Sequence, residues 1–68
     1  MNSKEIGDFI KERRKILRIQ QQDLAEISGL SLRTVTIVEN GEGNPSIQTM
    51  QKLADALGLE LKLTVKLK

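Results

Sequence analysis

The stretch SLRTVTIVENG, residues 31–41, decides how this chain folds. Five β-branched residues follow one another at its centre, residues 34–38. Such side chains favour strands, and five of them cost a helix roughly 2–3 kcal/mol relative to alanine. Intrinsic propensity therefore predicts a strand here, and the flanking residues must be weighed against it.

Two architectures compete for this stretch. In the first, residues 34–38 and 59–67 are parallel strands joined by a helix over residues 46–57. In the second, residues 31–40 form a helix and the C-terminal segment is the only strand. A two-stranded parallel sheet with helices on one face would be poorly covered in a chain of 68 residues.

The residues around the β-branched run favour the helix. Gly29 suits a positive φ at the end of a preceding helix, and Ser31 suits the N-cap of the next one. Val35 and Val38 lie three positions apart and would face inward together on a helix. Two short helices joined by such a turn form a helix-turn-helix unit.

Three further helices are predicted, over residues 3–17, 21–27 and 46–57. Asn2 and Glu5 form a capping-box pattern before the first, and Ser46 can cap the last. The expected inward residues are Ile6, Phe9, Ile10 and Leu17, then Leu24, Ala25 and Ile27, then Ile47, Met50, Leu53, Ala54 and Leu57.

The C-terminal segment LELKLTVKLK, residues 59–68, alternates apolar and polar residues, as a half-buried strand does. Its apolar residues are Leu59, Leu61, Leu63, Val65 and Leu67. The chain offers no second strand, so the same strand of a second copy would pair with it in a homodimer. We therefore predict a helical domain over residues 1–58 and a dimerisation strand over residues 59–68.

Composition excludes several functions. The chain has neither Cys nor His, which excludes disulfides, makes a zinc site improbable and removes common general bases and nucleophiles. Gly41 and Gly43 lack the third glycine of a dinucleotide loop. We expect no enzyme activity, cofactor, metal or small-molecule substrate. No apolar run approaches membrane-spanning length, so we expect a cytoplasmic protein without a membrane partner.

Charge gives a weak signal overall. Net charge is +2, and residues 1–58 hold eight Lys or Arg against eight Asp or Glu. Five basic residues nevertheless crowd one short segment: Lys11, Arg13, Arg14, Lys15 and Arg18. This cluster is either a solvated helix face or a patch that faces nucleic-acid phosphates.

One set of short motifs lies along residues 6–58: Gln21, Leu24-Ala25, Gly29-Leu30-Ser31, Val38-Glu39-Asn40-Gly41, Pro45 and Leu53-Ala54-Asp55-Ala56-Leu57-Gly58, with Ile6-Gly7, Ile10 and Arg14 upstream. In these motifs the chain resembles the phage repressor and Cro-like (XRE-type) helix-turn-helix family. The resemblance implies a mostly α, lambda-repressor-like domain of four helices. The chain departs from the family pattern in the first turn, where Arg18 and Gln20 replace the usual Gly and Ser or Thr.

The resemblance also implies roles for individual residues. It implies base reading in the major groove by Ser31, Leu32, Arg33, Thr36 and Ile37. It implies phosphate contacts by Gln21, Asn40 and Asn44. It further implies a buried structural ion pair between Arg14 and Glu39.

Five of these residues also have a plain structural interpretation. Arg33 is otherwise a solvated or phosphate-contacting side chain, and exposed Leu32 and Ile37 are ordinary on a surface. Asn40 is otherwise a helix C-cap that tolerates the left-handed region, and Gln21 a polar residue at a helix N-terminus.

We therefore expect a regulator, most simply a repressor, that binds a palindromic operator in double-stranded DNA as a homodimer. The alternative is an antitoxin that silences a HipA-type kinase toxin and regulates its own operon. The C-terminal strand favours that alternative, because HipB-like regulators share this architecture.

Overall fold

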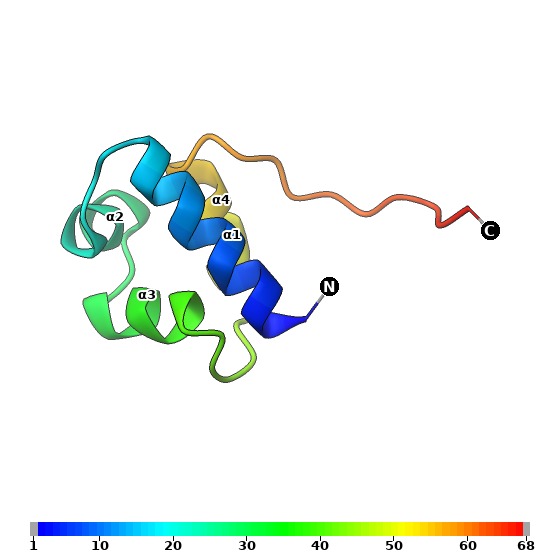
Figure 1. Cartoon of the computed structure of the whole chain (residues 1–68), viewed down its shortest axis with the longest axis horizontal. Helices are drawn as coiled ribbons and strands as arrows, with labels where there is room; N and C mark the ends of the chain where they lie inside the picture. Colours follow the sequence, from blue (N-terminus) through cyan, green and yellow to red (C-terminus); the bar gives the residue numbers. More distant parts are fainter. Residues whose placement is uncertain (1, 68) are drawn as a thin grey trace.

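The computed structural model describes residues 2–67, and four helices form its body. They are α1 (Ser3–Ile16), α2 (Gln21–Ser28), α3 (Leu32–Glu39) and α4 (Ile47–Ala56). Helix α3 contacts both α1 and α2, and α2 also contacts α4 (Figure 1). The β-branched run is therefore helical, as its flanking residues predict.

The ends of α3 explain how a β-branched segment becomes a helix. Ser31 is the N-cap, and its hydroxyl accepts a hydrogen bond from the Thr34 N–H at 3.1 Å. Val35 is fully buried and Val38 is 4% exposed. Burying two valine side chains contributes about 3–6 kcal/mol, which outweighs the propensity cost of the run.

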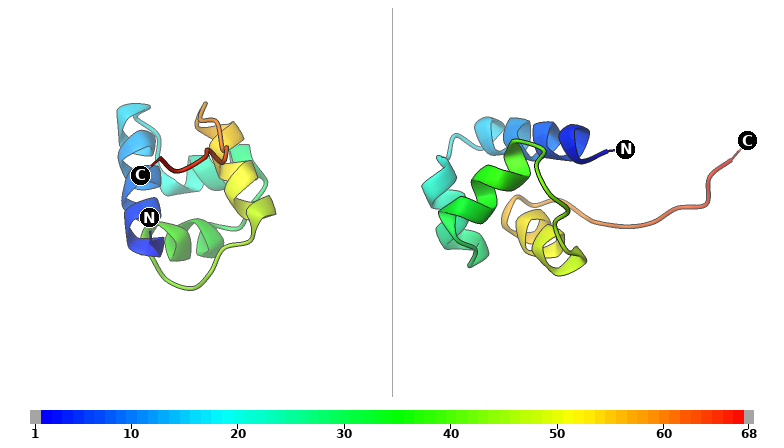
Figure 2. Two further views of the ribbon diagram at one scale, coloured as in Figure 1. Left: turned by 90° about the vertical axis from the view of Figure 1, so that its right-hand side faces the viewer. Right: turned by 90° about the horizontal axis from the view of Figure 1, so that it is seen from below.

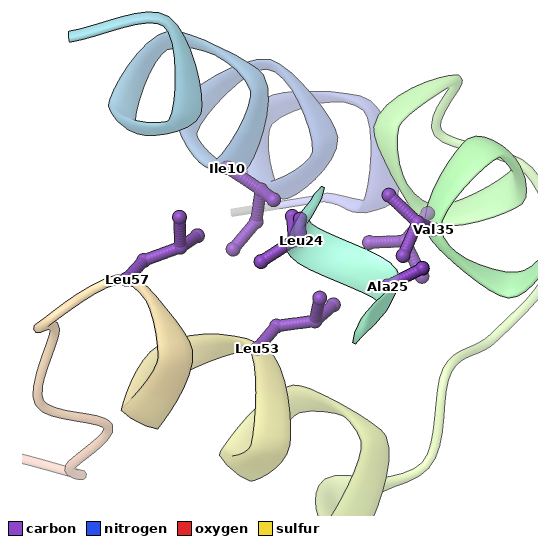
Figure 3. Close-up of a cluster of buried hydrophobic side chains, with 7 residues drawn as sticks. Ile10, Leu24, Ala25, Val35, Leu53 and Leu57 are labelled. Carbon is purple, nitrogen blue, oxygen red and sulfur yellow. The ribbon is translucent and has the colours of Figure 1, made fainter. Parts of the chain in front are cut away.

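One apolar core joins the four helices. Its labelled members converge in Figure 3, with Leu24 of α2 at the centre and Leu53 and Leu57 reaching it from the α4 side. The buried apolar side chains are Ile10, Leu24, Ala25, Val35, Val38, Leu53, Ala54 and Leu57. Four predicted inward positions are wrong, since Phe9, Leu17, Ile27 and Ile47 are 56%, 40%, 60% and 76% exposed. Helical period alone does not tell which side of a short helix meets a partner.

Three turns depend on residues with positive φ. Gly29 ends α2 at φ 76°, in agreement with the predicted turn. Arg18 adopts φ 59° in the first turn, where the family usually places Gly. Gly41 follows α3 at φ 73°, and a Cβ there would lie 2.7 Å from the Cα of Lys4. The loop after α3 is thus packed closely against the start of α1.

The C-terminal segment runs away from the helical body (Figure 1, and Figure 2, right). Leu59 packs against the core, whereas Leu63, Val65 and Leu67 are 88–100% exposed. Within residues 2–67 of this single chain no segment is assigned as a strand. A strand needs a hydrogen-bonding partner, so pairing with a second copy stays a prediction.

Candidate nucleic-acid interface

Helices α2 and α3 form a tightly joined pair. Gly29 turns the chain between them, and the Leu30 N–H donates to the Ala25 carbonyl oxygen at 3.1 Å. Ala25 is small and 4% exposed, which allows the two helices to approach closely. This arrangement fixes the direction in which α3 leaves the turn.

Helix α3 divides into a buried face and an outward face. Val35, Val38 and Glu39 are buried, whereas Leu32 and Arg33 are exposed. Thr36 and Ile37 are half-buried at the boundary between the two faces. The outward face borders an open depression of about 520 Å³ that is lined by Leu32, Arg33, Thr36, Ile37 and Glu42. Four of the five residues expected to read bases therefore share one surface, and the fifth, Ser31, caps the helix beside them.

A buried ion pair holds α3 against α1. Arg14 Nε donates to Glu39 Oε2 at 2.7 Å, and its Nη2 donates to Oε1 at 3.0 Å. The third guanidinium nitrogen, Nη1, donates to the Ile19 carbonyl oxygen at 2.8 Å. The side chains of Arg14 and Glu39 are only 10% and 1% exposed. The hydrogen bonds to Glu39 raise the pKa of Arg14, and desolvation opposes that rise.

Gln21 extends this network to the outward face of α3. Its Nε2 donates to Glu39 Oε1 at 3.0 Å, and its Oε1 accepts from the Thr36 hydroxyl at 3.2 Å. The Thr36 hydroxyl therefore donates within the protein, and its oxygen lone pairs and the threonine methyl remain as contact groups. One of the two Nε2 hydrogens of Gln21 is engaged by Glu39, so the second hydrogen and the backbone N–H groups of the first turn of α2 are the freer donors at this end.

The loop after α3 is held at both ends. The Glu42 N–H donates to the Ile37 carbonyl oxygen at 3.0 Å, and the Ser3 hydroxyl donates to the Gly43 carbonyl oxygen at 3.3 Å. Asn40 and Asn44 are exposed along this loop. Asn40 has φ −80°, so the suggestion that it occupies the left-handed region is wrong, because Gly41 takes that conformation instead.

The basic residues of α1 and of the turn after it have different surroundings and partners. Arg14 is buried in the ion pair, and Arg13 Nε donates to the Leu57 carbonyl oxygen at 2.9 Å. Lys15 and Arg18 remain exposed. The cluster is therefore not one continuous phosphate-facing patch, and two of its members connect helices.

Glu42 is a neighbour of the reading surface that the sequence pattern does not predict. The carboxylate-bearing residue nevertheless lines the same depression as Arg33. Its position depends on the positive φ angles of Gly41 and Gly43, which residue spacing does not reveal.

An exposed helix, locked by a turn onto a second short helix within a four-helix body, defines the helix-turn-helix class of DNA-binding proteins. Residues 10–63 match the helix-turn-helix family model, and the chain belongs to this XRE-type family. Its members are DNA-binding transcriptional regulators rather than enzymes. Within residues 2–67, no helix has the length and apolar character needed to cross a membrane.

Two of the relatives come from a bacteriophage. The chain is 30% identical over 63 residues to the ImmF control region 10 kDa protein of Bacillus phage phi105, covering 93% of this chain and 70% of that protein. It is 35% identical over 60 residues to the immunity repressor protein of the same phage, covering 88% of this chain but 42% of the relative.

A solved structure shares the fold. The restriction-modification controller protein C.AhdI from Aeromonas hydrophila superposes with a TM-score of 0.82 at 36% sequence identity. The match covers 85% of this chain and 88% of the controller protein. The four-helix arrangement described above is thus found in a protein whose name gives it a regulatory role.

Proposed function

We propose that this protein is a sequence-specific repressor that inserts α3 into the major groove of an operator. The observation that carries this proposal is the division of α3 into a buried face and an outward face around Arg33. A guanidinium can bind guanine O6 and N7 together, a contact that contributes about 1–3 kcal/mol of discrimination. Leu32, Ile37 and the methyl group of Thr36 would pack against thymine methyl groups.

The residues that surround α3 are suited to positioning it on the duplex. Gln21, Asn40 and Asn44 would supply phosphate contacts, with backbone N–H groups at the start of α2 assisting. Ser31 would face a base edge or the adjacent backbone from the N-terminal end of α3. The phosphate contacts would fix the register of the helix and carry no base preference themselves.

Binding as a homodimer would explain the exposed C-terminal segment. Residues 59–67 would pair antiparallel with the same segment of a second copy. A depression of about 340 Å³ between α1 and α4, lined by Phe9, Met50, Leu59 and Leu61 among others, offers apolar surface for this pairing to cover. Two reading helices would then contact half-sites about 34 Å apart on a palindromic operator.

Selection of bound sequences from a random DNA pool tests the proposed function. We expect the full chain to enrich a palindrome, and Arg33→Ala to lose about 1–3 kcal/mol of specific binding while non-specific binding changes little. Lys52→Ala removes an exposed positive charge on α4 and serves as the control. Equal loss of specific and non-specific binding in Arg33→Ala would reduce Arg33 to a phosphate contact, and failure to enrich any sequence would refute sequence-specific binding.

The antitoxin alternative stays a prediction from the sequence. Its direct test is binding of the purified protein to a HipA-type kinase, with kinase activity as the readout. Inhibition of the kinase at stoichiometric protein would support it, and no binding would leave operator control as the function.

A further inference from the structure

We propose that Glu42 is a specificity-determining residue that accepts a hydrogen bond from the N4 amino group of a cytosine in the operator. This inference rests on the proposed function, because it requires α3 to lie in the major groove. Glu42 lies in the loop that follows α3, and no part of the function proposed above uses it. Arg33 would donate hydrogen bonds to a base at this surface, and the Glu42 carboxylate would add a hydrogen-bond acceptor beside it.

The position of Glu42 carries the inference. It lines the open depression on the outward face of α3 together with Arg33 and Ile37. Its backbone N–H donates to the Ile37 carbonyl oxygen at 3.0 Å, which ties it to the last turn of α3. Gly43 also lies against this turn, since a Cβ there would lie 3.8 Å from Cγ2 of Ile37. Glu42 therefore moves with the reading helix and enters the groove when that helix does.

The side chain of Glu42 has no polar partner among the residues that the structure describes. It is exposed, and among residues 2–67 it forms neither a side-chain hydrogen bond nor an ion pair. In particular it does not pair with Arg33, although both line one depression. The carboxylate and the guanidinium are thus both available to an outside partner.

Charge decides which part of DNA a free carboxylate at this surface can face. A phosphate group would repel it, because both groups are negative. In the major groove, cytosine presents its N4 amino donor, and Glu or Asp is a side chain suited to accept from it. Guanine presents the O6 and N7 acceptors that suit Arg33. A depression that holds both side chains is therefore complementary to two neighbouring G·C pairs, one contacted at its guanine by Arg33 and the other at its cytosine by Glu42.

The test compares base preferences of the wild type, Glu42→Ala and Glu42→Gln at every position of the operator selected by the wild type. We expect one cytosine per half-site to lose its preference in Glu42→Ala by roughly 5- to 150-fold, the range for one good base contact. Preferences at all other positions, including the guanine assigned to Arg33, should stay unchanged. Glu42→Gln keeps the shape of the side chain and should shift the preference toward adenine, whose N6 and N7 a glutamine can bind.

Glu12→Ala is the matched control, because it removes another exposed glutamate on α1. It should leave every base preference unchanged. A uniform rise in affinity for all sequences in Glu42→Ala would overturn the inference, since Glu42 would then only repel phosphates. Loss of the guanine preference instead of the cytosine preference would also overturn it, since Glu42 would then position Arg33. If the wild type enriches no sequence, the proposed function itself fails, and these two failures are thereby distinguishable.

Discussion

Breaking the ion pair between Arg14 and Glu39 should destabilise the domain far more than removing both charges. In Arg14→Met, the Glu39 carboxylate is 1% exposed and, among residues 2–67, keeps only the hydrogen bond from Gln21. Removing one partner of a buried pair costs about 3–5 kcal/mol. A chain of 68 residues has a total free energy of unfolding of about 3–10 kcal/mol, so this variant should approach or reach the unfolded state.

The double variant Arg14→Met/Glu39→Leu removes both charges and fills the space with apolar groups. Replacing a buried pair in this way is often neutral or stabilising, so we expect it to recover most of the lost free energy. Recovery of folding should not restore operator binding fully, because Gln21 loses the acceptor that holds it beside Thr36. The comparison therefore separates the stability of the body from the positioning of the reading surface.

Urea unfolding followed by far-UV circular dichroism measures these effects, since the chain lacks Trp and Tyr and offers little intrinsic fluorescence. Lys4→Met is the control, because Lys4 forms an exposed pair with Asp8 at 3.6 Å that contributes at most about 0.5 kcal/mol. A loss below about 1 kcal/mol in Arg14→Met would refute the reasoning, since the pair would then behave like an exposed one. Equal destabilisation of the single and double variants would refute it as well.

Gly7→Ala should lower the free energy of unfolding by about 1–3 kcal/mol or more, because the added Cβ would overlap the Val38 carbonyl oxygen and lie 2.9 Å from the Glu39 carbonyl oxygen. An unchanged midpoint in urea unfolding would mean that α1 and α3 can separate freely. Ser31→Ala should cost about 1 kcal/mol, and Ser31→Asp should retain the cap, which an unfolding series of the two variants checks. Deleting residues 59–68 should convert a dimer to a monomer in sedimentation and weaken operator binding, and a truncated chain that stays dimeric would rule out the pairing strand. Hydrogen bonding to Glu39 raises the pKa of Arg14, so the stability that Arg14 contributes is complete below the unfolded-state pKa and is lost only as pH rises through the folded-state pKa. Arg14 should therefore contribute equally to the free energy of unfolding at pH 6 and at about pH 9, which the loss of urea midpoint in Arg14→Met at the two pH values checks.

Much of the helical body follows from local signals in the sequence. Ser31, Gly29 and the spacing of Val35 and Val38 are sufficient to predict α3 against its intrinsic propensity, because caps and burial outweigh the cost of β-branching. The exposure of Ile27 does not follow, since α2 is short and its contacts with α3 and α4 cover only part of its circumference.

The candidate site is only partly predictable. The family resemblance places Arg33, Thr36 and Ile37 on one outward face, and the structure brings them together at one depression. The contacts from Gln21 to Thr36 and Glu39 and the position of Glu42 depend on tertiary geometry and on loop conformation. The C-terminal segment is predicted by alternation alone, and its ordering requires a partner that a single chain does not contain.

The close packing of the loop after α3 on the start of α1 governs where a label can be attached. The Ser3 hydroxyl donates to the Gly43 carbonyl oxygen, and Gly41 lies against Lys4. The N-terminal end of α1 therefore packs against the loop that follows α3. An affinity tag or fluorophore at the N-terminus would therefore lie next to the proposed reading surface, and one at the C-terminus would lie on the proposed dimer strand. Lys52 is exposed on α4 and lines neither depression, so it offers an alternative attachment point.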